Sequence, residues 1–396
     1  MGPYTRPTRY NLSSFPAMPL INYITQIQFD FGAVRLLASE CERLGIRRPL
    51  IVTDAGIRAA GVLDTIVDAL GPAFATPVFD ATPPNPNEAA VRSAVEMYRT
   101  SQCDGVIAAG GGSSIDLAKG VAVCATHEGP LQSFAVIEGG LARITAATAP
   151  VIAIPTTAGT GSEVGRGAIL ILDDGRKVGV ISPHVVPKVA ICDPELTLGL
   201  PPMLTAATGM DAIAHCLETF MAPAFNAPAD GIALDGLWRA WRYIERATRD
   251  GSDRAARWNM MSASMQGALA FQKGLGCVHS LSHSLGGINP KLHHGTLNAI
   301  FLPSVIAFNS SAPSMQEEGK LGRIAQAMGL ASGDDVGGAI RAMTATLGLP
   351  RGLAELGVTR EMFPRIIAGA LKDHSHKTNP REASSDDYAA MLEASM

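Results

Sequence analysis

Histidines and carboxylates that could bind a metal gather in the second half of the chain. Five of the nine histidines lie between His215 and His294, in otherwise apolar sequence. Asp211 and His215 are four residues apart, and His279 and His283 repeat that spacing. Residues four apart on a helix project from the same face. One carboxylate and three imidazoles from separate elements would suit Fe(II) or Zn(II), with one coordination position left open for substrate.

Each of these features also has an ordinary structural explanation. A single pair at this spacing can be a polar stripe on one helix, but two pairs and the dipeptide His293-His294 within residues 211–294 together favour a metal site. Glu218 follows His215 by three residues. It could be a ligand, a group that orients the histidine, or a charge on the helix surface, and we favour the last two.

Two glycine-rich turns could hold a dinucleotide. Residues 109–119 follow an apolar run and open a helix, where free amides and the helix dipole favour a phosphate. Residues 155–163 follow another apolar run and carry four hydroxyls, which suit phosphate and ribose oxygens. The contact candidates are Gly111, Gly112, Ser113, Thr156, Thr157, Thr160 and Ser162.

The spacing of the glycines in the first turn does not by itself identify a ligand. It matches neither GxGxxG nor GxxxxGK[ST], so neither the Rossmann fingerprint nor the P-loop applies. A tight strand-to-helix turn without a ligand explains it equally well. Two such turns in one α/β domain favour a dinucleotide over a single phosphate, because each can hold a different part of it.

Asp54 bears on the choice between NAD and NADP. It follows the apolar run 51–53, where a carboxylate could accept hydrogen bonds from a ribose and repel a 2′-phosphate. This favours NAD, with NADP as the alternative. The residues alone slightly favour a simpler role for Asp54, as the N-cap of a helix.

Composition excludes several classes of protein. The chain has 396 residues, 17% of them charged, and a formal net charge of −4 without a basic block, which argues against nucleic acid as a partner. We find no uninterrupted apolar run long enough to span a membrane and no secretory leader. The six cysteines form no CxxC pair, which fits a reducing cytoplasm. The low charge content fits a homo-oligomer, most simply a dimer.

The elements that must position these residues fall into two parts. Residues 21–200 alternate between short β-branched runs and helical stretches, which predicts a parallel α/β domain behind an extended arm at residues 1–20. Residues 201–396 predict a helical domain. The expected strands are 49–53, 76–79, 105–109 and 151–155, and the expected helices include 33–44, 62–70, 87–99, 229–248 and 253–269.

With these residues assembled, the chain resembles the iron-containing, or group III, alcohol dehydrogenases from about residue 20 to the end. Residues 110–119, 156–163, 209–218 and 279–299 carry the resemblance. It implies an N-terminal dinucleotide-binding α/β domain, an all-α C-terminal domain and an active site in the cleft between them. It also implies NAD(P)-linked interconversion of alcohols and aldehydes, and it adds Asp116 to the cofactor-binding candidates.

Carried over residue by residue, the resemblance makes Asp211, His215 and His279 metal ligands and places His283 near nicotinamide and substrate. Metal would act as a Lewis acid on the substrate oxygen during hydride transfer, and His283 would relay the proton. The resemblance also strengthens the interpretation of Asp54 as an NAD contact.

The fourth ligand is a choice between two neighbours. In the family it is a histidine directly before glycine, usually fourteen residues after the third ligand. His294 precedes Gly295 but lies fifteen residues after His279, whereas His293 has the usual distance without the glycine. We choose His294, because a loop absorbs one inserted residue easily while the following turn sets the direction of the side chain.

The sequence is compatible with more than one class of substrate. A small primary alcohol or aldehyde is the main expectation, and a hydroxy acid such as 4-hydroxybutyrate is the alternative, because residues 292–299 look like those of some relatives with such substrates. Arg166 could bind a carboxylate, but a structural or exposed arginine explains it equally well. Two readings from other classes remain, a non-redox lyase of the dehydroquinate synthase type and a catalytically silent assembly protein.

Overall fold

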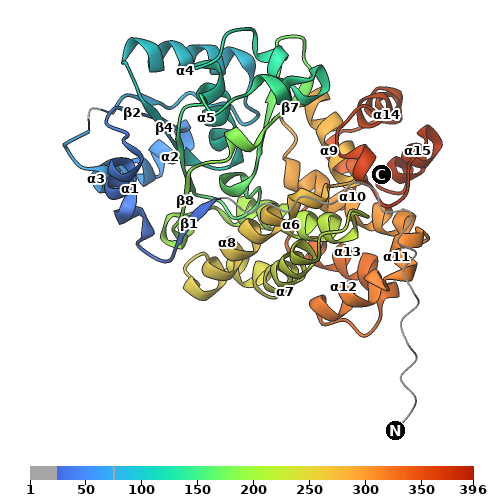
Figure 1. The fold of residues 1–396 in the computed structure, drawn as a ribbon. Helices are drawn as coiled ribbons and strands as arrows, with labels where there is room; N and C mark the ends of the chain where they lie inside the picture. Colours follow the sequence, from blue (N-terminus) through green and yellow to red (C-terminus); the bar gives the residue numbers. More distant parts are fainter. Residues whose placement is uncertain (1–24, 75) are drawn as a thin grey trace, which may run out of the picture.

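A parallel sheet forms the first part of the molecule (Figure 1). The computed structural model describes residues 25–74 and 76–396, so the arm expected at residues 1–20 lies outside the described residues. Within the described residues, the sheet has the order β1-β8-β5-β4-β2-β3, and all of its strand pairs are parallel. The strands are β1 (Gln26–Phe29), β2 (Pro49–Val52), β3 (Val78–Phe79), β4 (Gly105–Gly110), β5 (Val151–Pro155) and β8 (Val189–Cys192).

Helices cover both faces of this sheet, because its central strands are apolar on both sides. Every residue of β2, β4, β5 and β8 is buried. Along β4, Val106 and Ala108 pack with α4 and α5, while Ile107 and Ala109 pack with α1 and α3. The helices of this part are α1 (Leu37–Leu44), α2 (Ala55–Ala59), α3 (Val62–Leu70), α4 (Glu88–Thr100) and α5 (Gly112–Cys124).

The fold class predicted from the sequence is confirmed, but the prediction missed some strands. β1 and β8, each four residues long, were not expected. The antiparallel hairpin of β6 (Gly167–Ile171) and β7 (Lys177–Ile181) was also missed. Glycines inside it, such as Gly179, weaken the strand pattern.

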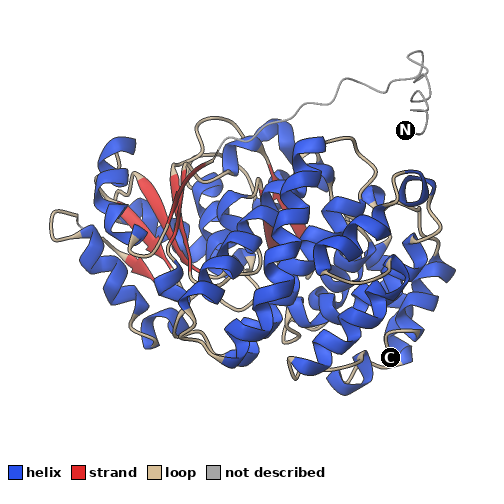
Figure 2. Ribbon diagram, turned by 90° about the horizontal axis from the view of Figure 1, so that it is seen from below, coloured by secondary structure: helices blue, strands red, loops and turns tan. Residues whose placement is uncertain are grey.

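The second part of the chain is helical, and Figure 2 shows it beside the part that holds the sheet. At its centre, every residue of α6 from Thr205 to Met221 is buried, so neighbouring helices surround α6. No described helix is long and apolar enough to cross a membrane. The helices are α6 (Pro202–Met221), α7 (Ala227–Arg249), α8 (Arg254–Leu269), α9 (Cys277–Ile288), α10 (His294–Asn309), α11 (Pro313–Glu317), α12 (Lys320–Met328), α13 (Val336–Thr346), α14 (Phe363–Ala370) and α15 (Ser385–Glu393).

Two buried lysines close the C-terminal end of α6. Lys273 donates to the carbonyl of Phe220 at 3.2 Å, and Lys320 donates to the carbonyls of Met221 and Ala222 at 3.2 Å each. A positive charge at this end offsets the negative end of the helix dipole and pairs its last carbonyls. These contacts hold in place the helix that carries Asp211 and His215.

Candidate active site

The two glycine-rich turns lie against each other at the carboxyl edge of the sheet. A Cβ at Gly112 would lie 2.5 Å from the side chain of Thr160, and one at Gly111 would lie 3.3 Å from that of Thr157. Glycine is therefore needed at residue 112 for the turns to approach this closely. The N-terminus of α5 has no side-chain cap, so its free amides remain for a ligand.

The two turns lie beside the reversal of strand order in the sheet. The chain continues from β2 to β3 on one side and returns to β4 on the other side of β2. In open α/β sheets, ligands bind outside the carboxyl ends of the strands at such a point. The first turn follows β4 and the second follows β5, its neighbour in the sheet. The topology thus places both turns where a dinucleotide is expected.

Asp54 contacts the first turn and caps a helix. Its Oδ1 accepts hydrogen bonds from the amides of Gly56 at 2.9 Å and Ile57 at 3.1 Å, as the N-cap of α2. Its Oδ2 accepts a hydrogen bond from the hydroxyl of Ser114 in α5 at 3.1 Å. The N-cap interpretation therefore holds, and the same contacts fix this carboxylate beside the first turn.

Asp116 of α5 and Ser162 of the second turn contact each other. The Ser162 hydroxyl donates to Asp116 at 2.5 Å, and the amide of Ile169 donates to the other carboxylate oxygen at 2.9 Å. Lys119 donates from Nζ to the carbonyls of Ser162, Gly165 and Gly167 at 2.7 to 3.0 Å. These buried polar groups join α5 to the second turn and hold its shape.

Glu163, in the second turn, supports a prediction of pH-dependent stability. Burial raises its pKa from 4.5 to about 7. The protonated carboxyl therefore contributes fully to the free energy of unfolding below pH 4.5. This contribution is lost as the pH rises through 7, because the buried group must then ionise. We expect Glu163→Gln to gain in free energy of unfolding over the wild type across this range, by roughly 3 kcal/mol at most.

Urea unfolding at pH 5 and pH 8 measures this difference. The exposed Glu96 of α4 provides the matched control, since Glu96→Gln should show the wild-type pH dependence. An equal effect of Glu163→Gln at both pH values would contradict the prediction.

Side chains from α6, α9 and α10 converge on the oxygen Oδ1 of Asp211. The Nε2 atoms of His215 and His294 lie 3.6 Å from it, and that of His279 lies 3.9 Å away. Asp211, His215 and His279 are buried, whereas the side chain of His294 is 26% exposed. Three helices thus bring one carboxylate and three imidazole nitrogens around a common point.

The start of α10 places the two neighbouring histidines, His293 and His294, differently. A Cβ at Gly295 would lie 2.0 Å from the carbonyl oxygen of Ala207, so α10 begins in direct contact with α6. This contact directs His294 toward Asp211. His293 is the exposed N-cap residue of α10.

The outer nitrogens of two of these imidazoles have hydrogen-bond partners. His215 Nδ1 lies 3.2 Å from the carbonyl oxygen of Gly159, and His279 Nδ1 bonds to Glu218 Oε2. Glu218 also accepts a hydrogen bond from the amide of Val278 at 2.8 Å. Because Glu218 is only 2% exposed, its interpretation as a surface charge is wrong. It contacts and orients His279 and not His215, the histidine that we had considered.

This donor set fits a divalent metal ion. Burial lowers the pKa of His215 to about 4 and that of His294 well below 6.5, so both imidazoles are unprotonated at neutral pH, as a ligand must be. Among the described residues, the buried Oδ1 of Asn298 has no hydrogen-bond partner. Its Nδ2 donates to Asp211 at 2.7 Å and also lies 3.2 Å and 3.4 Å from Nε2 of His294 and His279. One oxygen and three nitrogens match the preferences of Fe(II) and Zn(II).

Glu218 offers a test of the way His279 is held. We expect Glu218→Gln to weaken metal binding about 10- to 100-fold, because an amide orients the imidazole and raises its basicity less than a carboxylate does. Competition with a chelator measures the affinity. The exposed Glu245 of α7 is the control, and Glu245→Gln should bind metal as the wild type does. Unchanged affinity in Glu218→Gln would contradict the assigned role.

His283 lies beside this cluster and pairs with a residue that the sequence reasoning did not find. Its ring stacks on that of His294 at 5.3 Å between centroids, and its Nδ1 lies 3.0 Å from Oδ2 of Asp373. The amide of Ser375 donates to the other oxygen of Asp373 at 2.8 Å. The only sequence signal for Asp373 is its place in a short run with His374 and His376, since it lies 90 residues beyond His283.

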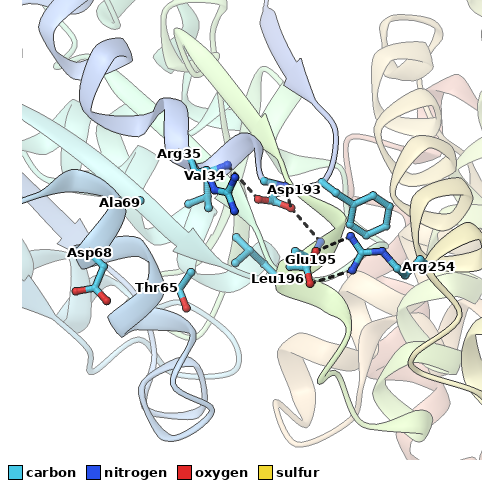
Figure 3. A pocket seen from close by; sticks show the side chains of 11 residues that line it. Val34, Arg35, Thr65, Asp68, Ala69, Asp193, Glu195, Leu196 and Arg254 are labelled. Carbon is cyan, nitrogen blue, oxygen red and sulfur yellow. Dashed lines mark hydrogen bonds and ion pairs between the residues drawn. The ribbon is translucent and has the colours of Figure 1, made fainter.

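A separate cleft of about 620 Å³ lies at the seam between the sheet and α8 (Figure 3). Arg254 and Glu195 form an ion pair there at 2.7 Å. Asp193, which follows β8, accepts hydrogen bonds from the amides of Gly32 and Val34 at 3.0 Å each. None of the site residues predicted from the sequence lines this cleft, and its polar groups serve to join the two parts of the chain.

Two adjoining glycine-rich turns at the switch point, next to a buried carboxylate and histidine cluster, are typical of a metal-dependent, nicotinamide-linked dehydrogenase. A family model described as iron-containing alcohol dehydrogenase matches residues 25–194, and one for the C-terminal part of that family matches residues 205–396. The chain therefore belongs to the iron-containing alcohol dehydrogenase family, and the resemblance noted in the sequence is confirmed.

Individual relatives agree with this family. The chain is 64% identical to 4-hydroxybutyrate dehydrogenase of Cupriavidus necator, over 96% of this chain and 100% of that protein. The crystal structure of a 1,3-propanediol oxidoreductase matches with a TM-score of 0.89 and 34% identity, over 96% and 100% of the two chains. A sulfoacetaldehyde reductase from Bifidobacterium kashiwanohense in complex with NAD+ matches with a TM-score of 0.86 and 27% identity, over 96% and 99%.

These comparisons confirm the expected activity class. The chain is an NAD-linked, metal-dependent alcohol dehydrogenase. The relatives carry the names of dehydrogenases, reductases and oxidoreductases, which favours redox chemistry over the lyase and the silent assembly protein.

Proposed function

We propose that this dehydrogenase interconverts a small hydroxy acid of the 4-hydroxybutyrate class and the corresponding semialdehyde, with NAD as the redox partner. The observation that carries this proposal is the 64% identity to a 4-hydroxybutyrate dehydrogenase along its entire length. At that level of identity, most side chains around the reacting centre are expected to be shared. A neutral primary alcohol is the second candidate, favoured by the match to a 1,3-propanediol oxidoreductase.

In this proposal, Asp211, His215, His279 and His294 hold Fe(II), with Zn(II) as the alternative. When bound, the metal supplies Lewis acidity toward the substrate oxygen while the nicotinamide exchanges a hydride with the substrate carbon. Glu218 keeps His279 oriented. Burial of Asp211, His215 and His279 limits the access of bulk water and strengthens electrostatic interactions there.

The two glycine-rich turns would hold NAD. Amides at Gly111 and Gly112 suit the pyrophosphate, and Asp54 is placed to accept from a ribose and to disfavour a 2′-phosphate. Thr156 contributes a buried hydroxyl that has no hydrogen-bond partner among the residues that the structure describes. The remaining candidates are Ser113, Asp116, Thr157, Thr160 and Ser162, of which Asp116 and Ser162 act by holding the second turn.

His283 is the proposed proton-transfer residue. Asp373 accepts from Nδ1–H of the imidazole, which leaves Nε2 without a proton. Burial lowers the pKa of His283 to about 4, so the ring is neutral and able to accept a proton at neutral pH. The proton of the substrate hydroxyl would pass through His283 on its way to solvent.

The first experiment compares aldehydes of equal length with and without a carboxylate. NADH consumption by anaerobically purified, Fe(II)-loaded protein is measured with succinate semialdehyde and with butanal, beside a chelated sample. We expect chelator-sensitive turnover and a higher kcat/KM for the semialdehyde. An equal or lower kcat/KM for the semialdehyde would overturn the hydroxy-acid assignment in favour of neutral alcohols.

We also propose a cytoplasmic homo-oligomer, most simply a homodimer. All six cysteines are free, which fits a reducing compartment. Light scattering coupled to size-exclusion chromatography measures the assembly, and a mass of a single 41.3 kDa chain would contradict it.

A further inference from the structure

A second group of possible metal ligands lies beside the cluster around Asp211. His283 comes from α9, and Asp373 and His374 come from the turn that follows α14. Each of the three offers one ligand atom, and these atoms all lie within 4.8 Å of one another. The group shares no residue with the ligand set proposed above, so it is a separate set of donors.

The oxygen Oδ2 of Asp373 is common to both histidines of this group. Nδ1 of His283 lies 3.0 Å from it, and Nδ1 of His374 lies 3.6 Å from it. The longer distance exceeds that of a hydrogen bond, so His374 is not simply bonded to the carboxylate. Ligand atoms around a tetrahedral ion with bonds of about 2.1 Å are about 3.4 Å apart, which falls between these two distances. A metal ion can therefore be accommodated with small shifts of the side chains.

The other oxygen of Asp373 is held by neighbouring groups. Its Oδ1 accepts from the amide of Ser375 at 2.8 Å and from the hydroxyl of Ser280 at 3.5 Å. Lys177, on β7, is a nearby positive charge that opposes a cation, but its Nζ donates to Oδ1 of Asn85 at 3.0 Å. Oδ2 is thus left to the two histidines.

Burial and access both suit a bound ion. The side chains of His283 and Asp373 are 8% and 9% exposed, whereas that of His374 is 30% exposed, which gives an ion a path from solvent. Two imidazole nitrogens and one carboxylate oxygen match Zn(II), with a fourth position for water. A neighbouring metal is no obstacle, because two-metal sites hold ions about 3.5 to 4 Å apart. Here each ion has a carboxylate of its own.

We propose that His283, Asp373 and His374 form a second site, for a divalent cation of the Zn(II) class, and that its occupation stops proton transfer by His283. The ion takes the lone pair of Nδ1, and the ring proton that Nδ1 donates to Asp373 moves to Nε2. Nε2 then carries a proton and cannot accept one from the substrate hydroxyl. This effect on turnover rests on the proposed role of His283, whereas the binding of the ion does not.

The test measures the metal content of the Fe(II)-loaded enzyme after anaerobic dialysis against Zn(II). The wild type should hold its iron and one further zinc per chain. His374→Phe keeps a ring against His283 but offers no donor, so it should bind this zinc more than about 100-fold more weakly, since even an outer partner of a ligand is worth about 10- to 100-fold. The exposed His293 gives the matched control His293→Ala, which should take up zinc as the wild type does.

The same samples are assayed for reduction of NAD with the alcohol that the wild type oxidises fastest. Zinc should lower kcat of the wild type by about 10²- to 10⁴-fold, because general-base catalysis is lost, and should leave KM for NAD unchanged. The kcat of His374→Phe should not respond to zinc at the concentration that saturates the wild type.

The outcomes separate the second site from the activity. Zinc that replaces the iron one for one, without a further equivalent, overturns the site. A further equivalent that survives in both His374→Phe and His374→Ala also overturns it, because other donors then hold the ion. Zinc that binds through His374 without lowering kcat overturns the block of proton transfer. If the loaded enzyme oxidises no alcohol, the proposed function fails, while the zinc content still decides whether the site exists.

Discussion

His279→Ala is expected to remove metal and activity together. The His279 imidazole comes from α9, is 1% exposed, and reaches within 3.9 Å of Asp211. Without it, the proposed site keeps three donors and loses the one that α9 supplies. Lewis acidity is worth several kcal/mol in such reactions, so turnover should fall by at least about a thousandfold. Metal content per chain and NADH consumption are measured on the same sample.

The neighbouring histidine provides the control for this variant. His293 is exposed and precedes His294 directly, so His293→Ala should keep both metal and turnover. The same comparison tests the choice of the fourth ligand, because His294→Ala should resemble His279→Ala. Metal-dependent activity that survives in His279→Ala would refute the proposed ligand set.

His283→Ala should retain metal but lose turnover. The ring lies beside the cluster, at 5.6 Å from the ring of His279 and 5.3 Å from that of His294, without belonging to the proposed ligands. General acid–base catalysis contributes about 10²- to 10⁴-fold, and a loss of that size in kcat is expected. Asp373→Asn should lower kcat by a smaller factor, about tenfold or more. The imidazole remains in this variant, but the hydrogen bond that sets its tautomer is weakened.

His374, which also contacts His283, allows proton transfer by His283 to be distinguished from a packing role. His374 stacks on His283 at 5.7 Å between centroids, and its side chain is 30% exposed. His374→Ala should therefore stay close to the wild type in kcat, although it removes a neighbour of His283. Turnover of His283→Ala equal to the wild type at every pH between 6 and 9 would show that the proton takes another route.

Much of the α/β part could be predicted because its elements are marked locally. The strand 151–155 and the helix 62–70 were expected with the bounds that the structure has. Continuous apolar runs specify buried parallel strands, and glycines on both sides of α3, at Gly61 and Gly71, mark its ends. The short outer strand β1 lacks such marks, and its pairing with β8 joins residues more than 160 positions apart.

For the candidate site, the sequence by itself determined the kinds of donors and their local spacing. Residues four apart share a helix face whatever the rest of the fold does, so Asp211 and His215 on α6, and His279 and His283 on α9, could be paired in advance. The two glycine-rich turns were recognisable for the same reason, since backbone geometry and hydroxyl content are local properties.

Only the tertiary structure decided which side chains from distant parts of the chain meet at the site. Contact of Gly295 with α6 directs His294 inward, and no spacing rule contains that contact. Asp373 reaches His283 from 90 residues away, and Lys177 reaches Asn85 from 92. Such pairs depend on how helices and the hairpin pack together, and packing is set by the summed burial of many side chains. The sequence therefore determined the chemistry that is available, whereas packing decided the direction in which each group points.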